Sequence, residues 1–259
     1  MMDNEFDILR LVRDVPSVAT IYGLQKKKIF GGWEYRVLME YCPYSLISIL
    51  QKMQKEKKKI PESAIWELMY DVTSALVFLH KQKPPIAHRD LKLENILLSK
   101  NNTWKLIDFG SCKKGRIELK NKAVMQKVED DIAKTTTQMY RAPELVDFFG
   151  ISYIDEKVDI WALGCILYTL LFMKQPFQDF NKLAIISGKY PPPPRHSYSS
   201  EIIDLLNKML TSQDKRISAA DAFKIIKAKV GRRGNKPLTW LPNLEEDNKG
   251  MSLYVFLID

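Results

Sequence analysis

Three side chains with oxygen donors stand at short spacings between Ile86 and Gly110, and they are the residues of this sequence best suited to chemistry. Asn95 follows Asp90 by five residues, and Asp108 comes thirteen residues later. A hard cation such as magnesium requires oxygen ligands and usually keeps phosphate oxygens and waters as the others. A lone Asp or Asn is usually a turn or a helix cap, whereas this set predicts a magnesium site.

The stretch around these residues has the pattern of a β-hairpin. Ile96–Leu98 is one short apolar run, Trp104–Ile107 is another, and Asn101–Asn102 lies between them. Asn tolerates the backbone conformations that a tight reversal needs. Such a hairpin brings Asn95, at the entrance of its first strand, close to Asp108, at the exit of its second. The loop before the hairpin adds the carboxylate of Asp90.

Three motifs in order resemble those of protein kinases. His88-Arg89-Asp90-Leu91-Lys92-Leu93-Glu94-Asn95 is similar to the kinase catalytic loop, and Asp108-Phe109-Gly110 is similar to the magnesium-binding motif. Ala142-Pro143-Glu144 follows at a suitable distance, and the resemblance covers roughly residues 5 to 229. It implies an α+β, protein-kinase-like fold, with a mainly helical C-terminal lobe and a truncated β-rich N-terminal lobe. The implied regions are 1–42 (N-lobe remnant with a helix, two strands and the hinge), 43–229 (C-lobe) and 230–259 (tail).

The resemblance also implies roles for the residues that hold metal and substrate. Transfer of the γ-phosphoryl group of ATP is mostly positioning and charge neutralisation. Asp90 would orient the attacking hydroxyl, while Asn95 and Asp108 would hold Mg²⁺. Lys92 would reach the transferred phosphate, as in kinases that act on serine and threonine, and Thr137 would tie the substrate loop to Asp90 and Lys92. A protein with serine or threonine hydroxyls would be the substrate.

The nucleotide would lie against the hinge that joins the two lobes. Glu40-Tyr41-Cys42-Pro43 directly follows an expected strand and occupies the hinge position. By resemblance, backbone groups here hydrogen-bond adenine, with Cys42 as the main contact. Met39 would stand at the back of the pocket and Leu97 would form its floor.

An amphipathic helix is expected over residues 3–13, because Phe6, Leu9 and Val12 recur at helical spacing. By resemblance, this helix packs beside the active site and Glu5 is the glutamate that pairs with a lysine. Glu5 as a solvated residue of the first helical turn is the alternative, since a negative charge suits that end of the helix dipole. Leu9 would join an internal stack with His88 and Phe109.

The remaining implied roles are structural and regulatory. Arg89 would pair with a phosphorylated residue of the loop after Gly110, with Thr135 and Thr136 as candidate phosphorylation sites. Arg216 would form a structural pair with Glu144. As an acid at the head of a buried helix, Asp159 would cap free N–H groups, which agrees with the brace of the backbone near His88 and Arg89 that the resemblance implies.

Residues 128–144 resemble the Numb-associated kinases, the family of the adaptor-associated and cyclin-G-associated kinases. Val128-Glu129-Asp130 leads to two threonines and then to Tyr140-Arg141-Ala142, and Ser111 follows the magnesium motif. This likeness implies clathrin-adaptor or endocytic proteins as partners. We also expect a short helix around residues 124–132.

Other patterns predict the elements around the site. We expect strands at 20–24 and 35–40, joined by a basic, Gly-rich turn over 26–32, and helices over 46–53, 61–79, 157–173, 201–210 and 218–229. Residues 191–194 predict an extended linker. We expect residues 230–259 to be a loosely ordered tail, in which MSLYVFLI is able to dock as a strand.

One part of the kinase pattern is missing from these residues. No Gly-x-Gly-x-x-Gly occurs, and the chain begins four residues before Glu5. The residues are therefore either an incomplete version of an active kinase or a pseudokinase or docking module built from the C-terminal lobe. We expect weak ATP binding and poor phosphorylation, together with exposed apolar surface around Phe6 and Leu9.

The composition limits the remaining classes of protein. The 259 residues are 46% hydrophobic and 27% charged, which suits a soluble domain with a core. No apolar run suits a membrane-spanning helix, and the three scattered cysteines indicate reduced thiols in a cytoplasmic protein. The net charge is +9, with lysines gathered at 52–59 and 224–236. We interpret them as a solvated helix end and a solvated tail. No nucleic-acid motif accompanies them, so we expect no nucleic-acid partner; contact with acidic lipid headgroups is a further alternative.

Overall fold

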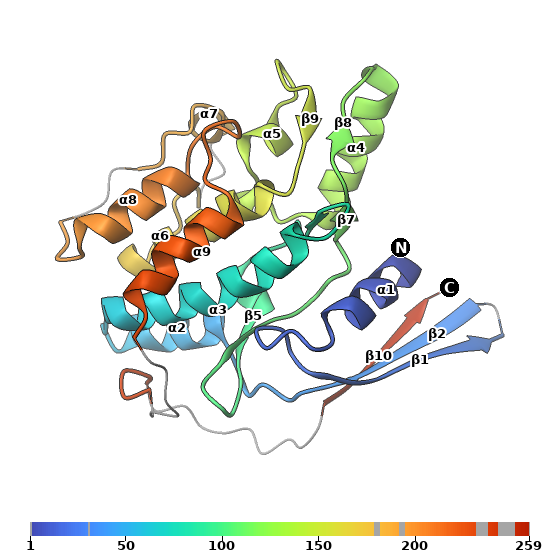
Figure 1. The fold of residues 1–259 in the computed structure, drawn as a ribbon, viewed down its shortest axis with the longest axis horizontal. Coiled ribbons are helices and arrows are strands. Elements are labelled where there is room, and N and C mark those ends of the chain that lie inside the picture. Colours follow the sequence, from blue (N-terminus) through green and yellow to red (C-terminus); the bar gives the residue numbers. More distant parts are fainter. Residues whose placement is uncertain are drawn as a thin grey trace.

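The computed structural model describes residues 2–30, 32–178, 182–191, 195–231, 238–242 and 252–258. Figure 1 shows a small part, in which a helix lies beside a three-stranded sheet, and a larger part built mainly of helices. The small part contains α1 (Met2–Val12), β1 (Ile21–Ile29), β2 (Gly32–Met39) and β10 (Ser252–Ile258), with the antiparallel strand order β1–β2–β10. The predicted α+β character and mainly helical larger lobe are confirmed.

The expectation of exposed apolar surface on the first helix is wrong. Phe6 and Leu9 are both buried, and the ring of Phe6 meets the edge of Tyr35 at 4.9 Å between centroids. The cause is that α1 packs its apolar side against β2, so the small sheet covers the helix. Burial of such side chains is what stabilises a short helix of this kind.

The predicted turn over residues 26–32 is also wrong, because its three lysines belong to β1. The β1–β2 ladder continues outward from Lys26 opposite Tyr35 to Ile29 opposite Gly32. The ammonium of Lys26 lies 4.5 Å from the ring centroid of Trp33 and contacts Asp3 at 2.5 Å. Cross-strand contacts of this kind support a strand in which the lysine run alone suggested a loop.

The tail prediction is confirmed in its strand alternative. β10 pairs with β2 from Ser252 opposite Met39 to Ile258 opposite Trp33. Residues 252–258 are therefore neighbours of the region assigned to residues 1–42. The expected extended linker at 191–194 lies, apart from Pro191, outside the described residues.

The larger part contains the predicted helices. The expected helices over 46–53, 61–79, 124–132, 157–173, 201–210 and 218–229 are confirmed with small shifts of their ends. The helices are α2 (Leu46–Lys55), α3 (Glu62–His80), α4 (Lys122–Thr135), α5 (Pro143–Val146), α6 (Val158–Phe172), α7 (Lys182–Ile186), α8 (Ser200–Met209) and α9 (Ala219–Lys229), with 3₁₀ turns η1 (Leu93–Asn95) and η2 (Gln138–Tyr140). The strands are β3 (Tyr44–Ser45), β4 (Ile86–Ala87), β5 (Ile96–Leu98), β6 (Trp104–Leu106), β7 (Lys113–Lys114), β8 (Ile117–Glu118) and β9 (Tyr153–Ile154).

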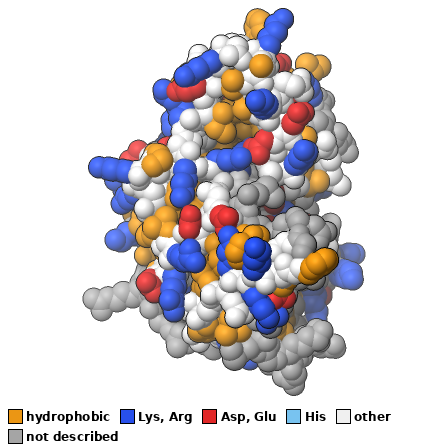
Figure 2. Space-filling model, turned by 90° about the vertical axis from the view of Figure 1, so that its right-hand side faces the viewer, with side chains coloured by type: hydrophobic (Ala, Val, Ile, Leu, Met, Phe, Trp, Pro, Cys, Tyr) orange, Lys and Arg blue, Asp and Glu red, His pale blue; other side chains and the backbone are white. Residues whose placement is uncertain are grey.

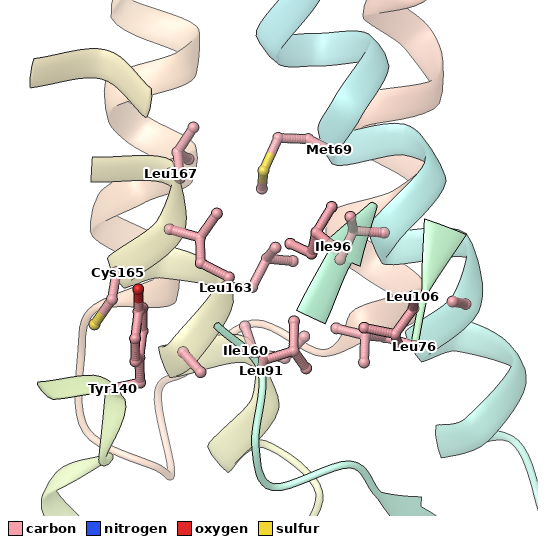
Figure 3. Packing of buried hydrophobic residues seen from close by; sticks show 14 of the residues in the cluster. Met69, Leu76, Leu91, Ile96, Leu106, Tyr140, Ile160, Leu163, Cys165 and Leu167 are labelled. Carbon is pink, nitrogen blue, oxygen red and sulfur yellow. The ribbon is translucent and has the colours of Figure 1, made fainter. Parts of the chain in front are cut away.

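Helix α6 is the centre of the core, since every one of its residues is buried. Figure 3 shows Ile160 and Leu163 of α6 facing Ile96 of β5, with Met69 and Leu76 of α3 on the far side of the same cluster. Packing of this kind holds α3, α6 and the β5–β6 hairpin in one rigid body. Among the helices described, none is both long and apolar enough to span a bilayer.

Candidate active site

The β5–β6 hairpin forms as the sequence predicts. Ile96 pairs with Leu106, and Asn102 in the connecting turn has a φ of 58°, in the left-handed region that Asn tolerates. The amide of Asn95 then lies 3.4 Å from a carboxylate oxygen of Asp108. The hairpin therefore brings the carboxamide and the second carboxylate to one edge.

The carboxylate of Asp90 is fixed from two sides. Its Oδ2 accepts a hydrogen bond from Lys92 Nζ at 2.5 Å, and its Oδ1 accepts one from Thr137 Oγ1 at 2.7 Å. Asn95 Nδ2 donates to the backbone oxygen of Asp90 at 2.9 Å. The expected tie between the loop at Thr137 and the catalytic loop is thus present as a direct contact to Asp90.

The donor set of this edge fits a magnesium ion. The amide nitrogen of Asn95 is directed toward Asp90 and Asp108, which leaves its Oδ1 as the atom able to bind a metal. Asp108 is exposed, so its carboxylate is accessible to a ligand from solvent. These hard oxygen donors, together with phosphate oxygens, match what Mg²⁺ requires.

Two residues of this region hold a backbone conformation that side chains disfavour. Arg89 has a φ of 70° and Asp108 a φ of 66°, both in the left-handed region. Such strain persists only where surrounding contacts over-determine it, and it is concentrated at functional sites.

Asp159 supplies those contacts for Arg89. Its side chain is buried, and its two oxygens accept hydrogen bonds from the backbone N–H groups of His88 at 2.7 Å and Arg89 at 2.8 Å. Nε2 of His80 contacts the same carboxylate at 2.9 Å. Burial acts to raise the pKa of Asp159, but these hydrogen bonds outweigh it and lower the pKa.

The brace position expected for Asp159 is therefore observed, and the N–H groups from which its carboxylate accepts belong to the catalytic loop. Asp159 is the second residue of α6, and its oxygens bond to the catalytic loop rather than to the first N–H groups of its own helix.

The catalytic loop is also attached to the core by apolar contacts. Figure 3 shows Leu91, which follows Asp90, beside Ile160 of α6. The ring of His88 lies edge-on to Phe109 at 5.4 Å between centroids, as the resemblance predicted, and Leu9 is buried in the same hydrophobic cluster. This close packing fixes the position of the catalytic loop at Asp90.

Glu5 faces the metal-binding edge. Its carboxylate lies near Gly110, within 3.3 Å of the place that a Cβ would occupy there. Burial, and secondarily the charge of Asp108, raise the pKa of Glu5 to about 7. Asn4, the preceding residue, donates to the backbone oxygen of Cys112 at 3.0 Å and fixes α1 to this loop. The fully solvated interpretation of Glu5 is therefore wrong, and its contacts within the described residues include no basic partner.

Arg89 pairs with an acid of the loop helix rather than with either threonine. Its guanidinium contacts Asp131 of α4 at 2.7 Å, and Lys113 contacts the same carboxylate at 3.0 Å. The hydroxyls of Thr135 and Thr136 donate to backbone oxygens one turn earlier in α4. The role of these threonines as phosphorylation sites stays a prediction.

Glu144 and Arg216 form the expected pair. Both side chains are buried, with Nη1 and Nη2 of Arg216 contacting the two Glu144 oxygens at 2.5 and 3.0 Å. Arg216 also donates to the backbone oxygens of Thr211 and Lys157. This network ties the segment after the substrate loop to the start of α6.

Comparison with known proteins assigns this arrangement to a family. Residues 1–225 match the family described as "Protein kinase domain". The chain belongs to the protein kinase family. It is 38% identical over 237 residues to a probable serine/threonine-protein kinase of Dictyostelium discoideum, which covers 91% of this chain and 21% of that protein. It is also 38% identical over 216 residues to actin-regulating kinase 1 of Saccharomyces cerevisiae, which covers 82% of this chain and 33% of that protein. The chain thus spans between a fifth and a third of the length of these relatives.

The segment expected to form the hinge lies between β2 and β3. Cys42 stands in this connection, and Ser45 at its end pairs with Leu97 of β5. Met39, Cys42 and Leu97 are each partly exposed, and burial raises the pKa of the Cys42 thiol to about 12. The Glu40 carboxylate is used internally, by Thr20 and Lys105, so a nucleotide would meet Glu40 through its backbone.

Sequence analysis did not find several partners of the site residues. His80 is the last residue of α3, Asp131 lies within a run of acids, and Lys105 lies in β6; none belongs to a motif. Only Lys105 gave a signal in the sequence. It interrupts the apolar run of β6, and a lysine in such a place is expected to be buried with an acidic partner. The pairing of Asp131 with Arg89 joins residues 42 positions apart, and no local pattern predicts it.

Proposed function

We propose that this chain is the catalytic part of a serine/threonine protein kinase, which transfers the γ-phosphoryl group of ATP to protein hydroxyls. The arrangement of Asp90 carries the proposal: its carboxylate is held between Lys92 and Thr137, beside Asn95 and Asp108. A protein that only docks to partners does not require a base, a cation and metal-binding residues in this arrangement.

In the proposed reaction, Asp90 accepts a hydrogen bond from the substrate hydroxyl and orients its oxygen toward the γ-phosphorus. A new O–P bond forms, the bond from the γ-phosphorus to the β-phosphate oxygen breaks, and the hydroxyl proton passes to Asp90. Lys92 offsets negative charge on the transferred group. Asn95 and Asp108 would hold Mg²⁺, which, when bound, neutralises charge on the phosphates.

The finer assignment is to kinases that act in endocytosis. The pattern of residues 128–144 resembles the Numb-associated kinases, and two relatives from Saccharomyces cerevisiae are named actin-regulating kinases. Both observations support clathrin-adaptor or other endocytic proteins as partners, and a cytoplasmic location. The substrate would be a serine or threonine in such a protein.

Phosphoamino acid analysis tests the proposed class of substrate. The chain is incubated with [γ-³²P]ATP, Mg²⁺ and a mixed protein substrate, and the labelled protein is hydrolysed. We expect label in phosphoserine and phosphothreonine, at a low rate because these residues include no Gly-rich loop and the described ones include no lysine paired with Glu5, and no label with Asp108→Asn. Label in phosphotyrosine, or label that survives Asp108→Asn, would contradict the proposal; a complete absence of transfer would favour the pseudokinase alternative.

A further inference from the structure

The outer end of the β1–β2 hairpin exposes large apolar side chains at a place with no function in phosphoryl transfer. Phe30 is fully exposed, and Trp33 and Ile29 expose 41% and 37% of their surface. In Figure 1 this end of the hairpin points away from the helical part of the molecule. We use the term hairpin tip for Lys27, Lys28, Ile29, Phe30 and Trp33.

Basic side chains flank these apolar groups. Lys27 and Lys28 are exposed, and neither forms an ion pair within the described part of the chain. The nearby acids are already paired, since Asp3 contacts Lys26 and Glu34 contacts Arg36. Figure 2 views the molecule from the side to which the hairpin points, and shows many Lys and Arg side chains with hydrophobic ones between them.

The combination of exposed aromatic side chains and unpaired lysines distinguishes the hairpin tip from the other exposed apolar residues that the structure describes. Phe149 is 93% exposed, but it follows Asp147 and Phe148 in a connecting loop that has no lysine next to it. At the hairpin tip, the fully exposed ring of Phe30 and the partly exposed ring of Trp33 lie near two lysines of β1 that form no ion pair within the described residues. A purely apolar groove on another protein would leave the two ammonium groups without counter-charges. The lysines therefore favour a partner that is anionic as well as apolar.

We propose that the hairpin tip binds the surface of membranes that contain anionic lipid headgroups. Phe30 and Trp33 enter the interfacial region, where aromatic side chains are favoured, and Lys27 and Lys28 contact the headgroups. The ladder of β1 and β2, which extends to Ile29 opposite Gly32, holds the strand ends that carry these side chains, so binding requires little ordering of the strands. The net charge of +9 favours the approach to such a surface.

Vesicle co-sedimentation of the full 259-residue chain tests this proposal. One set of vesicles contains phosphatidylserine at about a third of the lipid, and the other contains phosphatidylcholine alone, both at about 0.15 M salt. The test variants are Phe30→Ser with Trp33→Ser, and Lys27→Glu with Lys28→Glu. The controls are Phe149→Ser, for an exposed phenylalanine elsewhere, and Lys55→Glu with Lys59→Glu, for exposed lysines at the end of α2 and in the connection that follows it.

We expect binding to phosphatidylserine vesicles only, with about a tenfold or greater loss of affinity in both test variants and little change in the controls. Brominated lipid should also quench fluorescence of the wild type more than that of Trp33→Phe. Equal binding to both kinds of vesicle, equal losses in test and control variants, or no quenching at Trp33 would overturn the proposal. Stronger binding to duplex RNA than to vesicles, if the test variants lose it, would also overturn the proposal, because the hairpin tip would then be a nucleic-acid site.

Discussion

The guanidinium of Arg89, next to the proposed catalytic base, pairs with the carboxylate of Asp131 at 2.7 Å. Arg89 is buried, whereas Asp131 is partly exposed at the side of α4, where Lys113 also contacts it. A carboxylate in this place supplies the negative charge that a phosphorylated loop residue would otherwise bring. The loop after Gly110 is therefore held by residues already encoded in the chain.

The first prediction concerns this pair. Asp131→Asn should lower kcat about tenfold, because it leaves the buried Arg89 without a counter-charge and loosens α4. Thr135→Ala should leave kcat within about twofold, because its hydroxyl contacts only a backbone oxygen of α4. Initial rates of phosphatase-treated protein measure both effects.

Asp130→Asn is the matched control, because Asp130 is the neighbouring acid and lies on the exposed side of α4. An equal loss of rate in Asp130→Asn and Asp131→Asn would show that the charge of the helix, rather than the contact with Arg89, matters.

The second prediction concerns stability. Glu144→Ala removes one member of a buried, two-bonded pair and should cost about 3–5 kcal/mol of the free energy of unfolding. Replacement of both Glu144 and Arg216 by methionine should cost less than Glu144→Ala, because no charge is then left unpaired. Urea unfolding measures each variant, and Asp221→Asn, in an exposed pair with Lys224, is the control. A Glu144→Ala protein as stable as Asp221→Asn would contradict the burial of the pair.

The third prediction is a pH dependence from Glu5. Its pKa is raised to about 7 in the folded chain, so the folded state binds a proton more tightly than the unfolded state. The contribution of Glu5 to stability is therefore greatest at low pH and falls as pH rises from the ordinary value of 4.5 to about 7. Glu5→Gln should gain about 1 kcal/mol relative to the wild type over this range, after allowance for solvent screening.

Urea unfolding at pH 5 and pH 8 in the presence of a chelator measures this difference. Asp7→Asn, at an exposed acid of the same helix, is the matched control for removal of a carboxylate from α1. Parallel curves for Glu5→Gln and the wild type would place the Glu5 carboxylate in water and contradict the contact with the metal-binding edge.

The fourth prediction concerns the third strand of the small sheet. Deletion of residues 243–259 removes β10 and leaves one edge of β2 without its partner strand. Backbone amides of β2 should then exchange hydrogen faster than in the full chain, while those of α6 keep their protection. Unchanged exchange in β2 would show that the pairing with β10 does not persist in solution.

The local parts of the site could be predicted from sequence because their contacts join residues that lie close together along the chain. Turn residues between two apolar runs set the β5–β6 hairpin, and the hairpin alone brings Asn95 to Asp108. Helical spacing likewise predicted α1 and the buried face of α3. In each case the pattern and the packing require the same structure.

The long-range parts could not be predicted for physical reasons. The register between β10 and β2 joins residues more than two hundred positions apart, and an apolar strand contains no information on which edge it will meet. The lysines of β1 were assigned to a turn because their strand is stabilised by contacts with Asp3 and Trp33, not by their own propensity. The brace role of Asp159 came from the resemblance and from no local pattern, because the backbone N–H groups that it binds lie 70 and 71 positions away.

The rate of phosphoryl transfer in Asp90→Asn tests the central claim most directly. Wild type, Asp90→Asn and Asp130→Asn are compared in initial rates with [γ-³²P]ATP and Mg²⁺, after equal melting temperatures have been confirmed. The account predicts a slow but measurable rate in the wild type and in Asp130→Asn, and a loss of at least about a hundredfold in Asp90→Asn, because the substrate hydroxyl then has no base. A rate in Asp90→Asn equal to that of the wild type would contradict the assignment of Asp90 and, with it, the proposed active site.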